Sequence, residues 1–307
     1  STAIVIASAA RTPMGGFQGE LSGLTAPQLG SAAIKAAVAR AGIAAGDVGE
    51  VLMGNVLPAG VGQAPARQAA LGAGVPDSVP CTTVSKVCGS GMKAIMIAAD
   101  ALSTGNARVA VAGGMESMTN APYLLPKARG GFRLGHGEIK DHMFLDGLED
   151  AYEGRLMGTY AEEAARTYQF TREAQDAYAT ESLMRAQRAQ ADGGFDAEIA
   201  PVTVKGKGGD VSVSTDEQPR KVDPKKIPTL KPAFAKDGTV TAANSSSISD
   251  GAAALVLMTL AEAEKRGVTP LARIVGQASY AAKPALFTSA HVGAIARHFE
   301  RTGRSAR

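Results

Sequence analysis

Short apolar runs alternate with alanine-rich stretches of helical spacing over the first third of the chain. The stretch at 90–103 is apolar on nearly every side, which is typical of a helix inside the protein. Such alternation is the signature of βαβ units, and it predicts an α/β fold with a largely parallel sheet. Strands are predicted at 3–8, 51–56 and 107–112, and helices at 25–42, 65–71 and 90–103.

The alternation stops after Glu116. Prolines and a glycine-rich stretch at 129–137 follow, so we expect an inserted region. Within it, Thr159 and Glu162 form the pattern of a capping box at the start of one helix, and Thr171 begins another. A hairpin is predicted within 198–214, and strand, helix and strand resume at 252–258, 260–266 and 271–279.

Composition narrows the functional classes. The chain has 307 residues, 45% hydrophobic and 20% charged, with a net charge of +3, which is enough for a sizeable core. Because no basic stretch is interleaved with aromatic residues, nucleic acid is excluded as an expected partner. No apolar run is long enough to span a membrane, so we expect a cytoplasmic protein. The spacing of His136 and His142 matches no known zinc pattern, so no metal is expected.

The two cysteines differ in their surroundings. Cys88 directly precedes the apolar helical stretch, where free backbone N–H groups and the helix dipole favour a thiolate. Gly89 and Gly91 are expected to leave room for a ligand to approach the sulfur. This pattern suits an enzyme that carries an acyl group on sulfur, although placement alone equally allows a small buried hydrophobe. Cys81 has none of these features and is interpreted as structural.

Several motifs along the chain resemble the thiolase family. They begin with Arg11-Thr12-Pro13 and continue through the segment around Cys88 to the region of Asp250. The remaining matches are Asn55-Val56-Leu57, 62–68, Gly113-Gly114-Met115-Glu116-Ser117-Met118, Asp146-Gly147-Leu148, Met157-Gly158, Ala161-Glu162, 238–244 and 249–254.

The resemblance implies a thiolase fold of two related halves with an inserted loop domain that covers coenzyme A (CoA). The N-terminal half would comprise 1–117 and 250–268, the loop domain 118–249, and 269–307 would begin an incomplete C-terminal half. The implied activity is that of an acetyl-CoA acetyltransferase, in which two acetyl-CoA molecules give acetoacetyl-CoA and CoA, or the reverse. No cofactor is implied, because the CoA thioesters are substrates, and a homotetramer or homodimer is expected.

The resemblance also implies which residues contact CoA. Arg220 could meet phosphates through its planar donors, and Ser246 could bond the pantetheine amides. Without the resemblance, these two residues would be interpreted as a solvated charge and a turn serine, and Met157 and Phe287 as core. By motif position, the implied contacts are Leu148, Met157, Arg220, Ser246 and Phe287.

Three thiolase segments do not occur among the 307 residues. They are Asn-Glu-Ala-Phe, Gly-His-Pro and Cys-x-Gly, which carry the family's other catalytic groups, and neither His291 nor His298 matches the catalytic histidine. The resemblance breaks after Gly303, so we expect a truncated chain that would not catalyse condensation if it is the whole polypeptide. Two alternatives remain, an inactive acyl-CoA binder and a ketoacyl synthase that uses a carrier protein.

Overall fold

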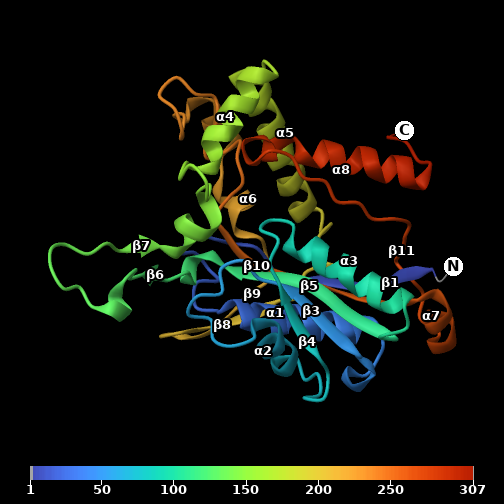
Figure 1. Cartoon of the computed structure of the whole chain (residues 1–307). Coiled ribbons are helices and arrows are strands. Elements are labelled where there is room, and N and C mark those ends of the chain that lie inside the picture. The colour runs from blue at the N-terminus through green and yellow to red at the C-terminus, as the bar shows by residue number, and fades with distance from the viewer. Residues whose placement is uncertain (1–2, 307) are drawn as a thin grey trace. The chain divides into compact units, whose positions relative to one another are not determined.

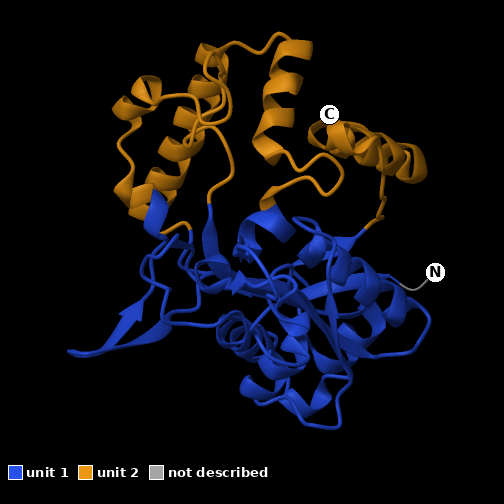
Figure 2. Cartoon of the chain, turned by 60° about the vertical axis from the view of Figure 1, so that its left-hand side comes forward, with its two compact units in different colours: residues 1–147, 195–218, 248–274 blue, residues 148–194, 219–247, 275–307 orange. Residues whose placement is uncertain are grey.

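The structure is a computed structural model that describes residues 3–306, and it forms two compact units (Figure 2). Unit 1 comprises the described residues up to 147, with 195–218 and 248–274. Unit 2 comprises 148–194, 219–247 and the described residues from 275. Parts of the predicted loop domain, 118–147 and 195–218, therefore pack within unit 1. The domain boundaries drawn from the resemblance stay a prediction.

A seven-stranded mixed sheet forms the centre of unit 1 (Figure 1). Its order is β11-β1-β10-β5-β3-β4, and β2 pairs with β10. The strands are β1 (Ile4–Arg11), β2 (Gly15–Gly16), β3 (Glu50–Gly54), β4 (Cys81–Val84), β5 (Val109–Ser117), β10 (Ser249–Thr259) and β11 (Ala272–Ile274).

The expectation of a largely parallel sheet is wrong. Two pairs of strands are parallel, β3 with β4 and β3 with β5. Strand β10 lies between β1 and β5 and is antiparallel to both. The crossover helices after β3 and β4 account for the parallel pairs, because parallel neighbours need a long connection. A strand buried on both faces has a continuous apolar pattern that does not reveal its direction, so β10 could not be oriented from sequence. The strand predicted at 271–279 is also shorter and ends at Ile274.

Three helices cover the sheet in unit 1. They are α1 (Ala26–Arg40), α2 (Pro65–Gly72) and α3 (Ser90–Ser103), close to the predicted ranges. Val51 and Met53 belong to the core cluster of α1 and α2, whereas Leu52 between them belongs to that of α3. This period of two places the first two helices and α3 on opposite faces. None of the helices among residues 3–306 is long and apolar enough to cross a membrane.

The insertion contributes to both units. In unit 1 it forms two hairpins, and the second was predicted from sequence. In unit 2 Thr171 caps α5 as predicted, since its side chain accepts a hydrogen bond from the Ala174 N–H. The remaining elements are β6 (Tyr123–Leu124), β7 (Lys140–Asp141), β8 (Val202–Gly206), β9 (Gly209–Val213), α4 (Met157–Thr167), α5 (Arg172–Ala191), α6 (Glu217–Lys221), α7 (Leu260–Arg266) and α8 (Phe287–Thr302).

The predicted capping box at Thr159 is wrong. Helix α4 begins two residues earlier, at Met157, and the Thr159 hydroxyl donates to the Leu156 carbonyl. Glu162 is buried and accepts backbone N–H groups of Thr239 and Val240 instead. A sequence pattern of capping type cannot reveal that a distant loop supplies better donors. By contrast, Thr25 and Gln28 do form a capping box at α1.

Gly113 permits the closest approach between β5 and β10. A Cβ atom at this position would lie 2.0 Å from the Ala253 carbonyl oxygen. We expect Gly113→Ala to lower the free energy of unfolding by about 3 kcal/mol or more, because a central strand pair must separate. Gly46→Ala is the matched control, since its Cβ would meet nothing within 4 Å. Urea unfolding of both variants measures the difference, and an equal midpoint for the two would contradict this assignment.

Candidate functional site

Cys88 lies in the turn that connects β4 to α3. Its side chain is exposed, and α3 begins two residues later with Ser90. The Ser90 hydroxyl accepts the Lys86 N–H at 2.7 Å and donates to the Val87 carbonyl at 2.6 Å. These two bonds close the turn around the cysteine. The turn follows the carboxyl end of a strand paired in parallel, which is where α/β folds place ligands.

Glycines bring the start of α3 close to the sheet. A Cβ atom on Gly54 would lie 2.7 Å from the Ser90 Cβ, and one on Gly114 would lie 3.4 Å from the Gly91 Cα. Gly91 therefore faces the sheet, and its expected role of leaving room for a ligand is wrong. A Cβ on Gly91 would make ordinary contacts at 3.7 Å with the backbone of Gly113 and Gly114, so Gly54 is the glycine that permits the close packing of α3 and fixes where the turn with Cys88 projects.

The Cys88 turn also contains a strained backbone. Val87 has φ +48°, a left-handed conformation that is costly for a β-branched residue. Its side chain is 53% exposed, so packing of the side chain does not explain the conformation. No described residue accepts a hydrogen bond from the backbone N–H of Cys88. This N–H is therefore available as a donor to the oxygen of a carbonyl group that the sulfur attacks.

A buried polar cluster lies in unit 1 after β3 and at the end of β5. The Glu116 carboxylate accepts the Asn55 side-chain amide at 2.8 Å and the backbone N–H groups of Val56 and Leu57 at 2.9 Å each. Burial raises the pKa of Glu116 above its usual 4.5, against the opposite effect of those backbone N–H groups. The sequence analysis assigned this glutamate only to a motif. The sequence did contain a signal for this site, which was a charged residue near the end of an apolar strand.

His142 is held by protein groups at both ring nitrogens. Nε2 accepts the Ala59 backbone N–H at 3.3 Å, and Nδ1 lies 2.5 Å from the Asp146 carboxylate. These contacts at both nitrogens fix the orientation of the imidazole ring. Among residues 3–306 no group of three His, Cys, Asp or Glu side chains is placed to hold a metal.

The five predicted CoA contacts all lie in unit 2. Met157 is the first residue of α4, and Phe287 is the first residue of α8. The starts of these two helices lie close together, because the ring of Tyr160 in α4 packs edge to face on that of Phe287, with 6.4 Å between the ring centroids. The structure thus brings these two predicted contacts to one region.

The other three predicted contacts are more dispersed. Leu148 ends a π-helical turn at Phe144–Leu148, and Arg220 is exposed on α6. Ser246 is exposed in the irregular segment before β10. The sequence analysis did not single out Phe234, whose ring packs on Gly158, the residue after Met157. A Cβ on Gly158 would lie 2.3 Å from this ring. The roles of all five contacts and of Cys88 stay predictions.

The chain belongs to the thiolase family: the model of the thiolase N-terminal domain matches residues 4–261. The resemblance and the thiolase fold are thereby confirmed.

Among similar proteins are acetyl-CoA acetyltransferases from several kingdoms. The one from Schizosaccharomyces pombe is 48% identical, over 100% of this chain and 78% of its own length. Acetyl-CoA acetyltransferase B, mitochondrial, from Xenopus laevis is 53% identical, over 98% and 71%. A thiolase from Ascaris suum, solved in complex with coenzyme A, superposes with a TM-score of 0.94 at 40% identity, covering 99% of this chain and 78% of that one.

Val87→Gly tests the strain in the Cys88 turn. Glycine adopts a positive φ without cost, so we expect the free energy of unfolding to rise by up to about 1 kcal/mol after the entropy of glycine is subtracted. Thermal and urea unfolding measure it, with Val222→Gly, at another exposed valine, as the control. Destabilisation equal to that of the control would contradict the strain.

Glu116→Gln tests the half-buried carboxylate. Because its folded-state pKa is raised, the folded protein binds more protons than the unfolded chain between pH 4.5 and the raised pKa. The stability of the wild type should therefore fall, relative to Glu116→Gln, as the pH rises through this interval. Urea unfolding of both proteins from pH 4.5 to neutrality measures the difference. If the difference in unfolding free energy between the two proteins did not depend on pH, the pKa of Glu116 would not be raised in the folded state.

Proposed function

We propose that this chain acts as an acetyl-CoA C-acetyltransferase, which condenses two acetyl-CoA molecules to acetoacetyl-CoA and CoA and also runs in reverse. The observation that carries the proposal is the exposed Cys88 in a closed turn before α3. The names of the similar acetyltransferases support the substrate.

The first half-reaction needs a sulfur nucleophile and an oxyanion donor. The Cys88 thiolate attacks the thioester carbonyl carbon of acetyl-CoA, and a bond forms between that carbon and the cysteine sulfur. The backbone N–H of Cys88 stabilises the negative charge that develops on the carbonyl oxygen. The bond to the CoA sulfur then breaks, and CoA leaves with the electron pair and takes up a proton. The product is acetyl-Cys88, and no metal or redox cofactor takes part.

The second half-reaction consumes the acetyl group. A base removes a proton from the α-carbon of the second acetyl-CoA, and the resulting carbanion attacks the carbonyl carbon of acetyl-Cys88. A carbon–carbon bond forms, and the Cys88 sulfur leaves with the electron pair of the broken thioester bond. In the family a second cysteine makes this proton transfer and a histidine activates the nucleophilic cysteine, and the segments that carry them do not occur among the 307 residues, whose cysteines are Cys81 and Cys88. Acyl transfer to Cys88 is the step that the geometry of the Cys88 turn supports directly.

We assign CoA to the five predicted contacts in unit 2. The edge-to-face packing of Phe287 on Tyr160 beside the start of α4 supports an apolar wall for the pantetheine arm. The exposed Arg220 offers fixed planar donors for phosphate. Met157, Leu148 and Ser246 complete the proposed set.

We also propose a homodimer or homotetramer in the cytoplasm. The loop between β6 and β7 extends away from the sheet of unit 1 (Figure 1). Four of its large apolar side chains are exposed, as is Tyr123 on β6, and together they offer apolar surface of the kind that another subunit covers. The four are Leu125, Phe132, Leu134 and Ile139. Sedimentation of the purified chain tests the assembly.

Two Xenopus relatives are mitochondrial by name, so fractionation of the source cells tests the compartment.

Brief exposure to acetyl-CoA tests the proposed function. We expect the intact mass to rise by one acetyl group in the wild type, because Cys88 forms the thioester, and the modified peptide to contain residue 88. Cys88→Ala should lose this modification completely. Cys81→Ala, at the half-buried cysteine, is the matched control and should keep it.

Two other results would contradict the proposal. Acetylation that persists in Cys88→Ala would assign the chemistry elsewhere. CoA binding without any acetylation of the wild type would favour the acyl-CoA binder over the enzyme.

A further inference from the structure

Residues 238–246 form an irregular segment in unit 2 that ends at Ser246, a predicted CoA contact. The segment has no helix or strand of its own, so its backbone polar groups need partners elsewhere. Ser246 itself is exposed. Its position therefore depends on what holds the residues before it.

Glu162 of α4 holds the first part of the 238–246 segment. Its carboxylate accepts the Thr239 N–H at 2.9 Å and the Val240 N–H at 2.8 Å. Glu162 is only 3% exposed, and among residues 3–306 no Lys or Arg forms an ion pair with it. Its buried charge is compensated by backbone donors, which ties the helix and the segment strongly together. A Cβ on Gly238 would lie 2.2 Å from this carboxylate, so the approach requires glycine.

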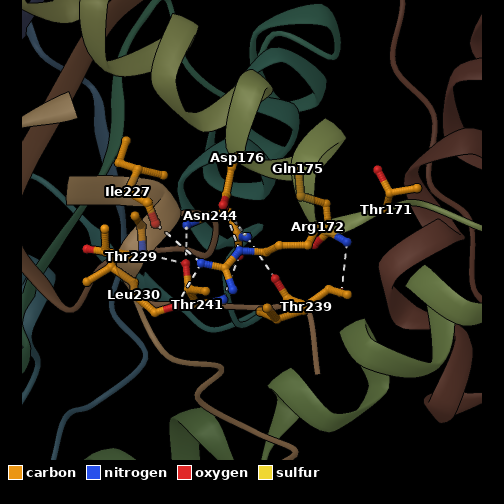
Figure 3. A network of polar contacts seen from close by, with 12 residues as sticks. Thr171, Arg172, Gln175, Asp176, Ile227, Thr229, Leu230, Thr239, Thr241 and Asn244 are labelled. Atoms are coloured by element: carbon orange, nitrogen blue, oxygen red, sulfur yellow. Dashed lines mark hydrogen bonds and ion pairs between the residues drawn. The ribbon is translucent and has the colours of Figure 1, made fainter. Parts of the chain in front are cut away.

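Asp176 of α5 holds the second part through Asn244 (Figure 3). The aspartate is 6% exposed and accepts the Arg172 Nε at 2.6 Å and the Asn244 Nδ2 at 3.1 Å. Asn244 Nδ2 also donates to the Thr239 carbonyl at 2.9 Å, while Oδ1 accepts the Thr241 N–H at 2.7 Å. Every polar atom of this amide is used, so its partners determine its orientation.

The turn immediately before Ser246 is closed internally. Thr241 is fully buried, and its hydroxyl oxygen accepts the backbone N–H groups of Ala243 and Asn244 at 3.2 and 3.3 Å. The Ser245 hydroxyl donates to the Thr241 carbonyl at 2.6 Å. A turn closed in this way moves as one piece. The anchors from α4 and α5 consequently determine where Ser246 projects.

We propose that Glu162 and Asp176 are positioning residues for acyl-CoA: they hold the 238–246 segment from two helices and so set the position of Ser246. The inference rests on the proposed function. Helix α4 also begins with Met157, so Glu162 keeps Ser246 in register with a second predicted contact. Pre-organised loops bind with less loss of conformational entropy, so loosening this one should weaken CoA binding.

Glu162→Gln and Asp176→Asn test the proposal in the full chain. Each substitution keeps the size of the side chain but removes its charge. Each also replaces one carboxylate oxygen, which now accepts an N–H group, by an NH2 group that can only donate. We expect the dissociation constant for CoA and the KM for acetyl-CoA to rise about tenfold, with the rate of acetylation at saturation within about twofold of wild type, because uniform binding is lost. Calorimetry and quenched-flow mass spectrometry measure these quantities.

A matched control separates positioning from general destabilisation. Glu262→Gln on α7 of unit 1 removes another largely buried carboxylate, 13% exposed, that accepts the Arg266 Nε at 2.6 Å. It should lower the melting temperature without changing the CoA dissociation constant. Gln175→Ala provides a milder variant that should stay folded, because it removes a half-buried side chain whose amide donates to the Thr239 hydroxyl at 2.9 Å. Its dissociation constant should rise by a smaller factor.

The outcomes are distinct. Suppose that the wild type binds CoA and that Gln175→Ala and the folded carboxylate variants bind it equally well. This result would overturn the positioning role and leave the proposed function intact. A wild type that binds no CoA would overturn the proposed function and this inference with it. A fall in CoA affinity that Glu262→Gln shares would assign the effect to stability and overturn the positioning role.

Discussion

The placement of Cys88 depends on how closely α3 can approach the sheet. Gly54 at the end of β3 and Gly114 in β5 leave no side chain between the sheet and the first turn of α3, where Gly91 meets them. A Cβ on Gly54 would push the helix outward, because it would lie 2.7 Å from the Ser90 Cβ. Since the turn with Cys88 is attached directly to that helix, the same displacement would move the sulfur. Close backbone packing is therefore a condition of the proposed chemistry at Cys88 as well as of the core.

Buried carboxylates hold the irregular segments of each unit. In unit 1, Glu217 accepts the Gly16 and Glu20 N–H groups, and Asp250 accepts the Thr119 N–H. In unit 2, Glu162 and Asp176 do the same for the 238–246 segment. A carboxylate can accept several donors at once, and burial strengthens each bond, so one side chain fixes a whole turn. The segment that contains Ser246 is thus held by carboxylate hydrogen bonds from two helices.

The site combines local strain with this global rigidity. Val87 keeps a left-handed backbone only because the Ser90 hydroxyl and the start of α3 hold the residues on either side. Strain of this kind persists where the surrounding structure over-determines it, and it is concentrated at functional sites. At this turn the Cys88 side chain is exposed, and no described residue accepts a hydrogen bond from the Cys88 backbone N–H.

Sequence alone determined the elements that depend on short-range order. The apolar periodicity of α1 and α3, the helix start at Thr171 and the motif around Cys88 are local, so they could be predicted within a few residues. The tertiary structure decided the antiparallel place of β10, the inward role of Gly91 and the partner of Glu162. Each of these depends on a segment far away in the chain, and a buried strand, a glycine or a carboxylate has the same local pattern whichever partner it meets.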